Sequence, residues 1–178
     1  MKYLVVGSNG QLGSELKARL SSEADYKDHS SLDITDENTV ANFFKENSYD
    51  IVINCAAYTA VDKAEEDEEA ADRVNRVGPA LLARYGRNII HISTDYVFDG
   101  AAHTPYRETD PTNPQSVYGS TKLAGEKAVF QEAHSATIIR TSWLYSTHGN
   151  NFLKTMRRLG TERKSLGVIF DQIGTPTY

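Results

Sequence analysis

The sequence has one cysteine, no apolar run long enough to cross a membrane and no secretory signal. A single cysteine excludes a disulfide within the chain. Cys55 lies in the apolar run "DIVINCAA", which predicts a buried thiol rather than a nucleophile. We therefore expect a cytoplasmic protein with no membrane partner.

Clustered basic residues and metal-ligand spacings are also missing. The formal net charge of −5 argues against a nucleic-acid or anionic-membrane surface, because either would require a basic patch. We predict no metal site, because no metal-ligand spacing links the five histidines His29, His91, His103, His134 and His148. The length of 178 residues predicts one domain with a sizeable core.

Short β-branched segments alternate with helical patterns along the chain. The predicted strands are 3–7, 50–54, 88–93, 137–141 and 166–170. The predicted helices are 11–20, 37–47, 66–85, 117–133 and 151–160. Short, almost wholly apolar strands are typical of a parallel sheet that helices cover on both faces. The predicted fold class is therefore α/β, a doubly wound parallel sheet of the Rossmann type, which binds ligands at the carboxyl ends of its strands.

The segment "VVGSNGQLGSEL" places Gly7, Gly10 and Gly13 between the first strand and the first helix. This spacing is typical of a dinucleotide-binding loop. Gly7 suits the tight turn, Gly10 lets the backbone approach a pyrophosphate, and Gly13 lets helix and strand pack closely. The strand–turn–helix context favours a dinucleotide site over a purely structural turn.

A dinucleotide site also predicts an acidic residue about twenty positions further on, to hold the adenosine ribose. Asp33 stands at that spacing in "SLDITDEN". An equally good interpretation is a turn residue, since Thr35 and Asp36 are both suited to cap the next helix. The stretch 22–31, where the second strand should lie, is unusually polar for a central parallel strand.

The preference between NADPH and NADH stays open. Acidic side chains near the second strand favour an unphosphorylated ribose, and basic ones can bind a ribose phosphate. The sequence offers both kinds, namely Asp25, Lys27, Asp28, His29 and Asp33.

Small and polar residues follow two further predicted strands. After strand 50–54, Ala56 and Ala57 would let a flat cofactor lie close to the backbone and Thr59 could donate to it, although a plain loop is the alternative. After strand 88–93, the chain places polar side chains where an α/β site is expected, namely Ser93, Thr94, Asp95 and Tyr96.

Tyr118 and Lys122 stand four positions apart in "VYGSTKLAGE", so on a helix they project from the same face. A free phenol has a pKa of about 10, and a nearby ammonium in a site drained of water by a bound cofactor would lower it. The pair is therefore predicted to be a tuned proton donor, with Thr94 able to hydrogen-bond the same carbonyl oxygen. Taken alone, this spacing is more often an accident of an exposed helix.

Trp143 is the single tryptophan and follows the predicted strand 137–141 in "RTSWLY". A core position is one interpretation. The other is stacking on a sugar or base, which suits the carboxyl end of a strand.

Eight motifs in order resemble the extended short-chain dehydrogenase/reductase superfamily and, within it, the dTDP-4-dehydrorhamnose reductases: "GSNGQLG", "LDIT", "NCAAYTAVDKAE", "HISTDYVFDG", "YGSTKLAGE", "RTSWLY", "GNNFLKTM" and "DQIGTPTY". The resemblance implies that NADPH or NADH reduces the C4 keto group of a dTDP-deoxysugar, giving dTDP-L-rhamnose. It implies that Tyr118 protonates the C4 oxygen, that Lys122 lowers the pKa of Tyr118 and binds the nicotinamide ribose, and that Thr94 completes the catalytic set.

The resemblance also implies the ligand contacts. For the cofactor these are Gly7, Asn9, Gly10, Gln11, Leu12, Gly13, Asp33, Ile34, Ala56, Ala57, Tyr58, Thr59, Tyr118 and Lys122. For the sugar nucleotide they are Val61, Thr94, Asp95, Tyr96, Tyr118 and Trp143. Some members form homodimers with magnesium bound at the position of Glu15, where we expect an exposed helix carboxylate.

The chain departs from the family pattern in length. Residues 1–160 resemble the dinucleotide-binding domain of the family. Residues 161–178 resemble its last strand and the start of its substrate-binding lobe, which is longer in other members. The stretches 24–31 and 81–90 are shorter than in the family.

Two alternatives remain. A related nucleotide-sugar dehydratase or epimerase would share the glycine loop and the Tyr118–Lys122 pair, but dehydration typically uses an Asp–Glu pair after the threonine, and here Tyr96 follows Asp95. A regulatory subunit would bind the cofactor without turnover, and Tyr118→Phe would then leave its function intact.

Overall fold

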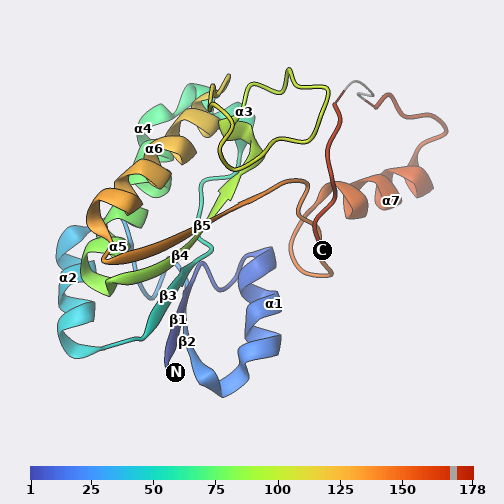
Figure 1. The fold of residues 1–178 in the computed structure, drawn as a ribbon. Coiled ribbons are helices and arrows are strands. Elements are labelled where there is room, and N and C mark those ends of the chain that lie inside the picture. Colours follow the sequence, from blue (N-terminus) through green and yellow to red (C-terminus); the bar gives the residue numbers. More distant parts are fainter. Residues whose placement is uncertain (169–171) are drawn as a thin grey trace.

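The computed structural model describes residues 1–168 and 172–178 (Figure 1). Its strands are β1 Tyr3–Val6, β2 Ala24–Lys27, β3 Ile51–Asn54, β4 Asn88–Thr94 and β5 Ser135–Thr141. They form one sheet in the order β2-β1-β3-β4-β5, and every neighbouring pair is parallel. The predicted doubly wound α/β class is confirmed.

Helices connect the strands. The α-helices are α1 Gln11–Leu20, α2 Glu37–Glu46, α3 Val61–Glu66, α4 Glu68–Asp72, α5 Gly78–Gly86, α6 Val117–Glu132 and α7 Phe152–Glu162. Shorter turns are η1 Ser21–Glu23, the π-helical η2 Arg73–Val77 and η3 Asp95–Val97. Helices α2, α5 and α6 cover one face of the sheet, and α1 lies on the other beside β1 and β2 (Figure 1).

The larger part of the core lies between the sheet and α2, α5 and α6. Leu4, Val52, Leu82 and Val129 are fully buried there. A smaller cluster around Val5 packs beneath α1. Because both clusters bury side chains of β1 and β3, the centre of the sheet is covered on both faces, as the apolar strands predicted.

The polar second strand has a physical explanation. β2 is the edge of the sheet, pairs only with β1 and has mostly half-buried side chains, so polar residues are tolerated there. Asp25 in β2 accepts a hydrogen bond from the Tyr49 hydroxyl at 2.8 Å and pairs with the Lys2 ammonium at 3.2 Å. The expectation of a central position for this strand was therefore wrong.

The predicted helix 66–85 is interrupted. The chain turns helical earlier, at Val61, and breaks at Asp67, whose carboxylate accepts from the backbone N–H of Ala70 and caps α4. From α4 the chain continues through η2 directly into α5. The short join to β4 is the single residue Arg87, whose φ of 68° reverses the chain at once.

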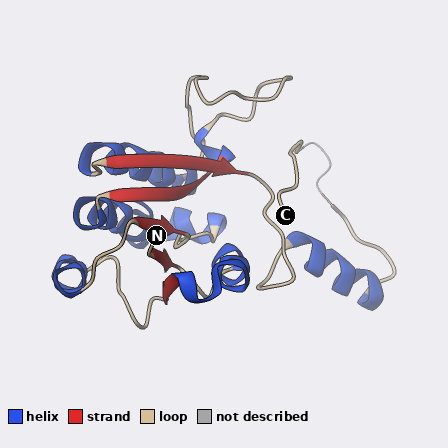
Figure 2. Ribbon diagram, turned by 60° about the horizontal axis from the view of Figure 1, so that its bottom comes forward, coloured by secondary structure: helices blue, strands red, loops and turns tan. Residues whose placement is uncertain are grey.

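The segment 142–178 follows the sheet. In both views α7 lies apart from the sheet, on the side where the strands end (Figure 1 and Figure 2). The backbone N–H of Tyr145 donates to the carbonyl of Thr177 at 2.9 Å, which brings the C-terminal residues back beside 142–145. Of the predicted strand 166–170, residues 166–168 are not in a strand, and residues 169 and 170 lie outside the described residues. Within the described ranges, no helix is long and apolar enough to cross a membrane.

Candidate active site

The glycine loop between β1 and α1 approaches the end of β3 closely. Gly7 has a φ of 76°, and a Cβ there would lie 2.5 Å from the backbone nitrogen of Ala56. A Cβ on Gly13 would collide with the carbonyl oxygen of Gly7. Both positions therefore require glycine, one for the turn and one for the fit of α1 against the loop.

The N-terminus of α1 opens at this loop. Gly10 is the N-cap residue, and no side chain in the described part of the protein caps the helix there. The first backbone N–H groups of α1 can therefore donate to an anion, and the positive end of the helix dipole favours an anion there. This arrangement is the one that binds a pyrophosphate.

The acidic residue beside the glycine loop is Asp28, which follows β2 directly. Its carboxylate accepts from the side-chain amide of Asn9 at 2.6 Å, and hydrogen bonds from Ser31 and Ser30 lower its pKa to about 2. Asp28 is therefore ionised at neutral pH and lies where a ribose hydroxyl is expected. The spacing from Gly13 predicted Asp33 instead, and Asp28 was named only among the charged residues near the second strand.

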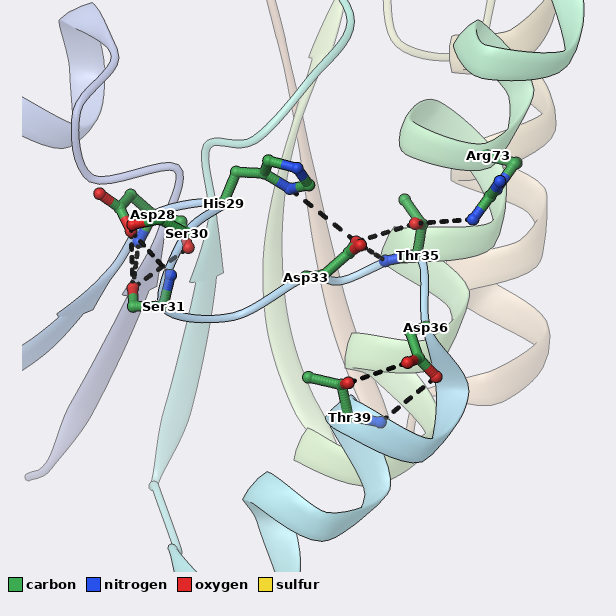
Figure 3. A network of polar contacts seen from close by, with 9 residues as sticks. All are labelled: Asp28, His29, Ser30, Ser31, Asp33, Thr35, Asp36, Thr39 and Arg73. Atoms are coloured by element: carbon green, nitrogen blue, oxygen red, sulfur yellow. Dashed lines mark hydrogen bonds and ion pairs between the residues drawn. The ribbon is translucent and has the colours of Figure 1, made fainter.

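Asp33 lies in a separate turn (Figure 3). Its carboxylate accepts from the backbone N–H and the hydroxyl of Thr35 at 2.9 and 2.8 Å, which lowers its pKa, and Arg73 donates to the same hydroxyl at 3.2 Å. Asp36, not Asp33, caps α2. The structure thus supports a turn role for Asp33.

A cleft of about 480 Å³ lies at the carboxyl ends of the strands. It brings together most of the predicted site residues, from the first turn, the end of β3, the end of β4, α6 and the segment after β5. These are Gly10, Gln11, Leu12, Ala57, Thr59, Val61, Thr94, Asp95, Tyr96, Tyr118, Lys122 and Trp143. The prediction that a ligand site lies at the carboxyl ends of the parallel strands, where polar side chains gather, agrees with this cleft.

Other predicted contacts do not line this cleft, namely Gly7, Asn9, Gly13, Asp33, Ile34, Ala56 and Tyr58. Ile34 is 5% exposed and packs against Gly78, so its side chain belongs to the core. Tyr58 is held by Asn75, a buried residue of η2, through bonds to its backbone N–H and carbonyl at 2.8 and 3.2 Å. Sequence reasoning missed Asn75, whose partner is seventeen positions away.

Helix α6 presents Tyr118 and Lys122 to the cleft. Ser116 caps the helix by accepting from the backbone N–H of Gly119 at 3.1 Å. A Cβ on Gly119 would collide with the carbonyl oxygen of Tyr96, so this glycine lets α6 pack directly on η3. The ring of Tyr118 meets that of Tyr96 edge to face, with centroids 5.5 Å apart.

The pKa of Tyr118 is raised, not lowered. Burial of the phenol is the main cause, the nearby Asp95 carboxylate adds to it, and the Thr94 hydroxyl opposes it. The charge of Lys122 does not contribute to this shift, and its amino group donates to the carbonyl of Ile92 at 2.6 Å. The expectation that Lys122 lowers this pKa concerns the site with a bound cofactor and stays a prediction.

Lys122 is almost completely buried, with 1% of its surface exposed. Burial lowers the pKa of its amino group to about 8, and the charge of Glu126 opposes the shift. Glu126 is itself buried and forms an ion pair with Arg140 of β5 at 2.6 Å. The cleft floor therefore holds an ammonium that gives up its proton far more readily than a free lysine.

At the end of β4, Thr94 is 6% exposed. Its hydroxyl donates to the Asp95 carboxylate at 3.1 Å and accepts from the backbone N–H of Tyr96 at 3.2 Å. Burial raises the pKa of Asp95, and the bond from Thr94 partly offsets this. These contacts fix the Thr94 oxygen beside Tyr118.

Trp143 is 47% exposed and lines the cleft, so the interpretation as a core residue was wrong. Its backbone has a φ of 48°, which is uncommon for a bulky residue and turns the chain sharply after β5. Gly174 lies against the indole, since a Cβ there would be 2.5 Å from the ring nitrogen.

A second hollow of about 500 Å³ lies at the amino ends of the strands. It is lined by Met1, Asp50, Ile51, Asn88 and Ser135. It has no acid–base pair and no glycine loop, so the carboxyl-end cleft is the candidate active site.

The sequence matches the family described as RmlD substrate binding domain over residues 1–178. It is 45% identical to a dTDP-4-dehydrorhamnose reductase of Sinorhizobium fredii, over 99% of this chain and 62% of that protein. The crystal structure of a dTDP-4-dehydrorhamnose reductase from Clostridium acetobutylicum superposes with a TM-score of 0.96 at 49% identity, over 99% of this chain and 65% of that one. A dTDP-4-dehydrorhamnose reductase from Bacillus anthracis, solved in complex with NADP, gives a TM-score of 0.95 at 41% identity, over 100% of this chain and 66% of that one. The chain thus spans about two thirds of the length of these relatives.

Proposed function

The chain belongs to the RmlD substrate binding domain family, and we propose that it carries the cofactor site and the catalytic side chains of an NAD(P)H-dependent reductase. The proposed reaction reduces the C4 keto group of dTDP-4-dehydro-L-rhamnose to the hydroxyl of dTDP-L-rhamnose. The observation that carries the proposal is the single cleft in which Thr94, Tyr118 and Lys122 lie opposite the start of α1.

The residues present fit a dinucleotide. Gly7 and Gly13 let the loop pack against the end of β3 and against α1, Gly10 lines the cleft, and the start of α1 offers backbone donors for the pyrophosphate. Asp28 would accept from a ribose hydroxyl, and the backbone at Ala57 and Thr59 would border the nicotinamide end. When bound, the reduced cofactor supplies a hydride for C4.

Tyr118 supplies the proton. Because its pKa is raised, the phenol is protonated at neutral pH and can donate to the C4 oxygen as the carbonyl double bond opens. The phenol O–H bond breaks and a new O–H bond forms on the sugar, which completes the alcohol. The Thr94 oxygen is held by the backbone N–H of Tyr96, and its proton would turn from the Asp95 carboxylate to the C4 oxygen and stabilise the charge there.

The remaining cleft residues would bind the sugar nucleotide. Tyr96 and Trp143 are aromatic and partly exposed, at 42% and 47%, so each can stack on a ring without leaving a buried position. Val61 adds an apolar wall from α3. Lys122 would hold the nicotinamide ribose from the cleft floor.

The choice between NADPH and NADH depends on Asp28. An ionised carboxylate at the end of β2 accepts from a free 2′-hydroxyl and repels a 2′-phosphate. The relative from Bacillus anthracis was nevertheless solved with NADP. Both cofactors therefore belong in the test, together with Asp28→Ser, which should favour NADPH relative to NADH.

The proposed function is tested by following cofactor oxidation when dTDP-4-dehydro-L-rhamnose is added. We would compare this chain, the chain joined to the C-terminal third of the Clostridium acetobutylicum relative, and Tyr118→Phe in the joined form. The expected result is turnover in the joined form and its loss in the phenylalanine variant, with cofactor binding retained. Binding without turnover in every form would contradict the reductase and favour a regulatory subunit.

A further inference from the structure

A line of buried polar side chains runs beneath the cleft from β3 to α6. Asn54 ends β3, His91 lies in β4 and Lys122 lies in α6, and their exposed fractions are 0%, 0% and 1%. Buried polar groups are costly unless they are hydrogen-bonded, so the contacts along this line are specific. The proposed reaction uses only the last member.

The bonds along this line have a direction. The side-chain oxygen of Asn54 accepts from the backbone N–H of Ala56 at 3.0 Å, so the amide nitrogen of Asn54 is the atom that faces Nδ1 of His91, also at 3.0 Å. An amide nitrogen can only donate, and Nδ1 of His91 must therefore be the acceptor. The backbone at Ala56 thus fixes the orientation of Asn54, and Asn54 fixes the tautomer of His91.

His91 is held neutral with its proton on Nε2. Burial and the neighbouring charge of Lys122 keep the pKa of the imidazole well below its ordinary value, so the ring carries one proton. With Nδ1 accepting, that proton is on Nε2, which lies 3.4 Å from the amino nitrogen of Lys122. Two donors then face each other whenever Lys122 is charged.

The charged Lys122 must therefore direct its protons elsewhere. Its amino nitrogen donates to the carbonyl of Ile92 at 2.6 Å, a much shorter contact than the one to His91. The other groups facing it are the buried thiol of Cys55, whose pKa is raised by burial to about 12, and Glu126, which is paired with Arg140. Of these neighbours, His91 is the one that faces Lys122 with an N–H donor at 3.4 Å.

Resting on the proposed function, we propose that Asn54 and His91 are positioning residues. They transmit the placement of the Ala56 backbone to Lys122 and direct its ammonium past His91 to the carbonyl of Ile92 at the cleft floor. The backbone at Ala56 borders Gly7 of the glycine loop. The end of β3 that would contact the cofactor therefore also fixes the direction of the Lys122 amino group. Neither Asn54 nor His91 touches the reacting atoms.

The first test is the tautomer of His91 in this chain at neutral pH, from two-bond 1H–15N spectra without any ligand. The expected result is a neutral ring protonated on Nε2. A ring protonated on Nδ1, or an imidazolium, would overturn the proposal. Because no cofactor is present, this outcome does not depend on whether the chain is a reductase.

The second test compares His91→Gln with His91→Asn, since the side-chain amide of glutamine reaches the position of Nε2 and that of asparagine reaches only Nδ1. Lys122 is titrated through its 13Cε signal, and NADPH affinity is measured by fluorescence. We expect His91→Gln to resemble the parent. In His91→Asn, which no longer faces Lys122 with a donor, the lysine midpoint should move to higher pH and NADPH affinity should fall about tenfold.

His134→Gln is the matched control, because His134 is exposed and lies just before β5, at the amino ends of the strands. It should change neither readout. Equal behaviour of the glutamine and asparagine variants, both like the parent, would refute a positioning role. If the parent binds no cofactor, the proposed function fails, but the titration of Lys122 still decides whether His91 acts on it.

Discussion

Residues 1–141 bury many of their apolar side chains, whereas residues 142–178 leave theirs partly or fully exposed. In the first region Leu4, Leu82 and Val129 are fully buried between the sheet and its helices. In the second, Phe152 is 60% exposed and Leu153 48% exposed, and Ser146 is the one buried residue among those described. The first region therefore has a core of its own, and the second is held by hydrogen bonds within itself and by the bond from Asn151 to Gln11.

The difference separates the two halves of the candidate site. The cradle for the dinucleotide and the side chains Thr94, Tyr118 and Lys122 all belong to the region with the core. The aromatic side chain proposed for the sugar nucleotide, Trp143, belongs to the other. Substitutions of the same type in each region test this contrast.

The largest contrast is expected between two ion pairs. Glu126→Gln removes the buried charge that pairs with the part-buried Arg140 and should cost about 3 kcal/mol of unfolding free energy. Glu162→Gln breaks the exposed pair with Arg158 in α7 and should cost about 0.5 kcal/mol or less. Urea unfolding measures both, and equal costs would refute the contrast.

Two leucines give the next contrast. Leu82→Ala removes a fully buried side chain and leaves a cavity, so it should cost about 3 kcal/mol. Leu153→Ala trims a half-exposed side chain and should cost about 0.5 kcal/mol. A large loss at Leu153, seen as a lower urea midpoint, would mean that α7 is part of the same core.

Two helical glycines should respond with opposite signs. A Cβ on Gly125 of α6 would collide with the carbonyl oxygen of Asn75, so Gly125→Ala should destabilise the protein by about 2 kcal/mol. A Cβ on Gly160 of α7 meets nothing, so Gly160→Ala should stabilise that helix by up to about 1 kcal/mol. Thermal unfolding reports the first change and helical circular dichroism the second.

The smallest expected effect is the pH dependence that Lys122 contributes. Its folded pKa of about 8 lies below the ordinary value of 10.5, so between these values the unfolded chain binds more protons than the folded one. The cost of burying the charge is fully present below pH 8 and is relieved as pH rises. The unfolding free energy should therefore rise by about 1 kcal/mol between pH 8 and 9.

The control for this rise is Lys122→Met, which should lack it. The window ends near pH 9 because Cys55 acts in the opposite direction above it. The folded pKa of that thiol is raised to about 12, so the unfolded chain loses the proton first and stability falls. A parallel pH profile in the parent and the variant would contradict the burial of a charged lysine.

Much of the fold could be predicted because its signals are local. The apolar runs of β1, β3, β4 and β5 and the glycine loop each lie within a few residues, and strand order then brings their ends together. β2 gave no such signal, since its polar side chains are permitted by an edge position that only the assembled sheet defines. The helix break at Asp67 depends on one local cap that competes with a continuous helical pattern.

The site was predicted less completely, because its tuning depends on contacts between distant residues. His91 and Lys122 are thirty-one positions apart, and Asn54 and His91 thirty-seven. The sign of the pKa shift of Tyr118 is set by burial, which no short motif reveals. Spacing favoured Asp33 over Asp28, and only the assembled sheet shows that Asp28 follows β2 directly and contacts Asn9 of the glycine loop.

The most direct test of the account is calorimetric titration of NADPH and NADH into this chain and into Gly7→Ala and Gly100→Ala. Both glycines have a positive φ, 76° and 74°, but a Cβ is blocked only at Gly7. The account predicts one-to-one binding of a dinucleotide by this chain and by Gly100→Ala, and no binding by Gly7→Ala. A folded chain that binds neither cofactor, or equal binding by all three proteins, would contradict a complete cofactor site within residues 1–141.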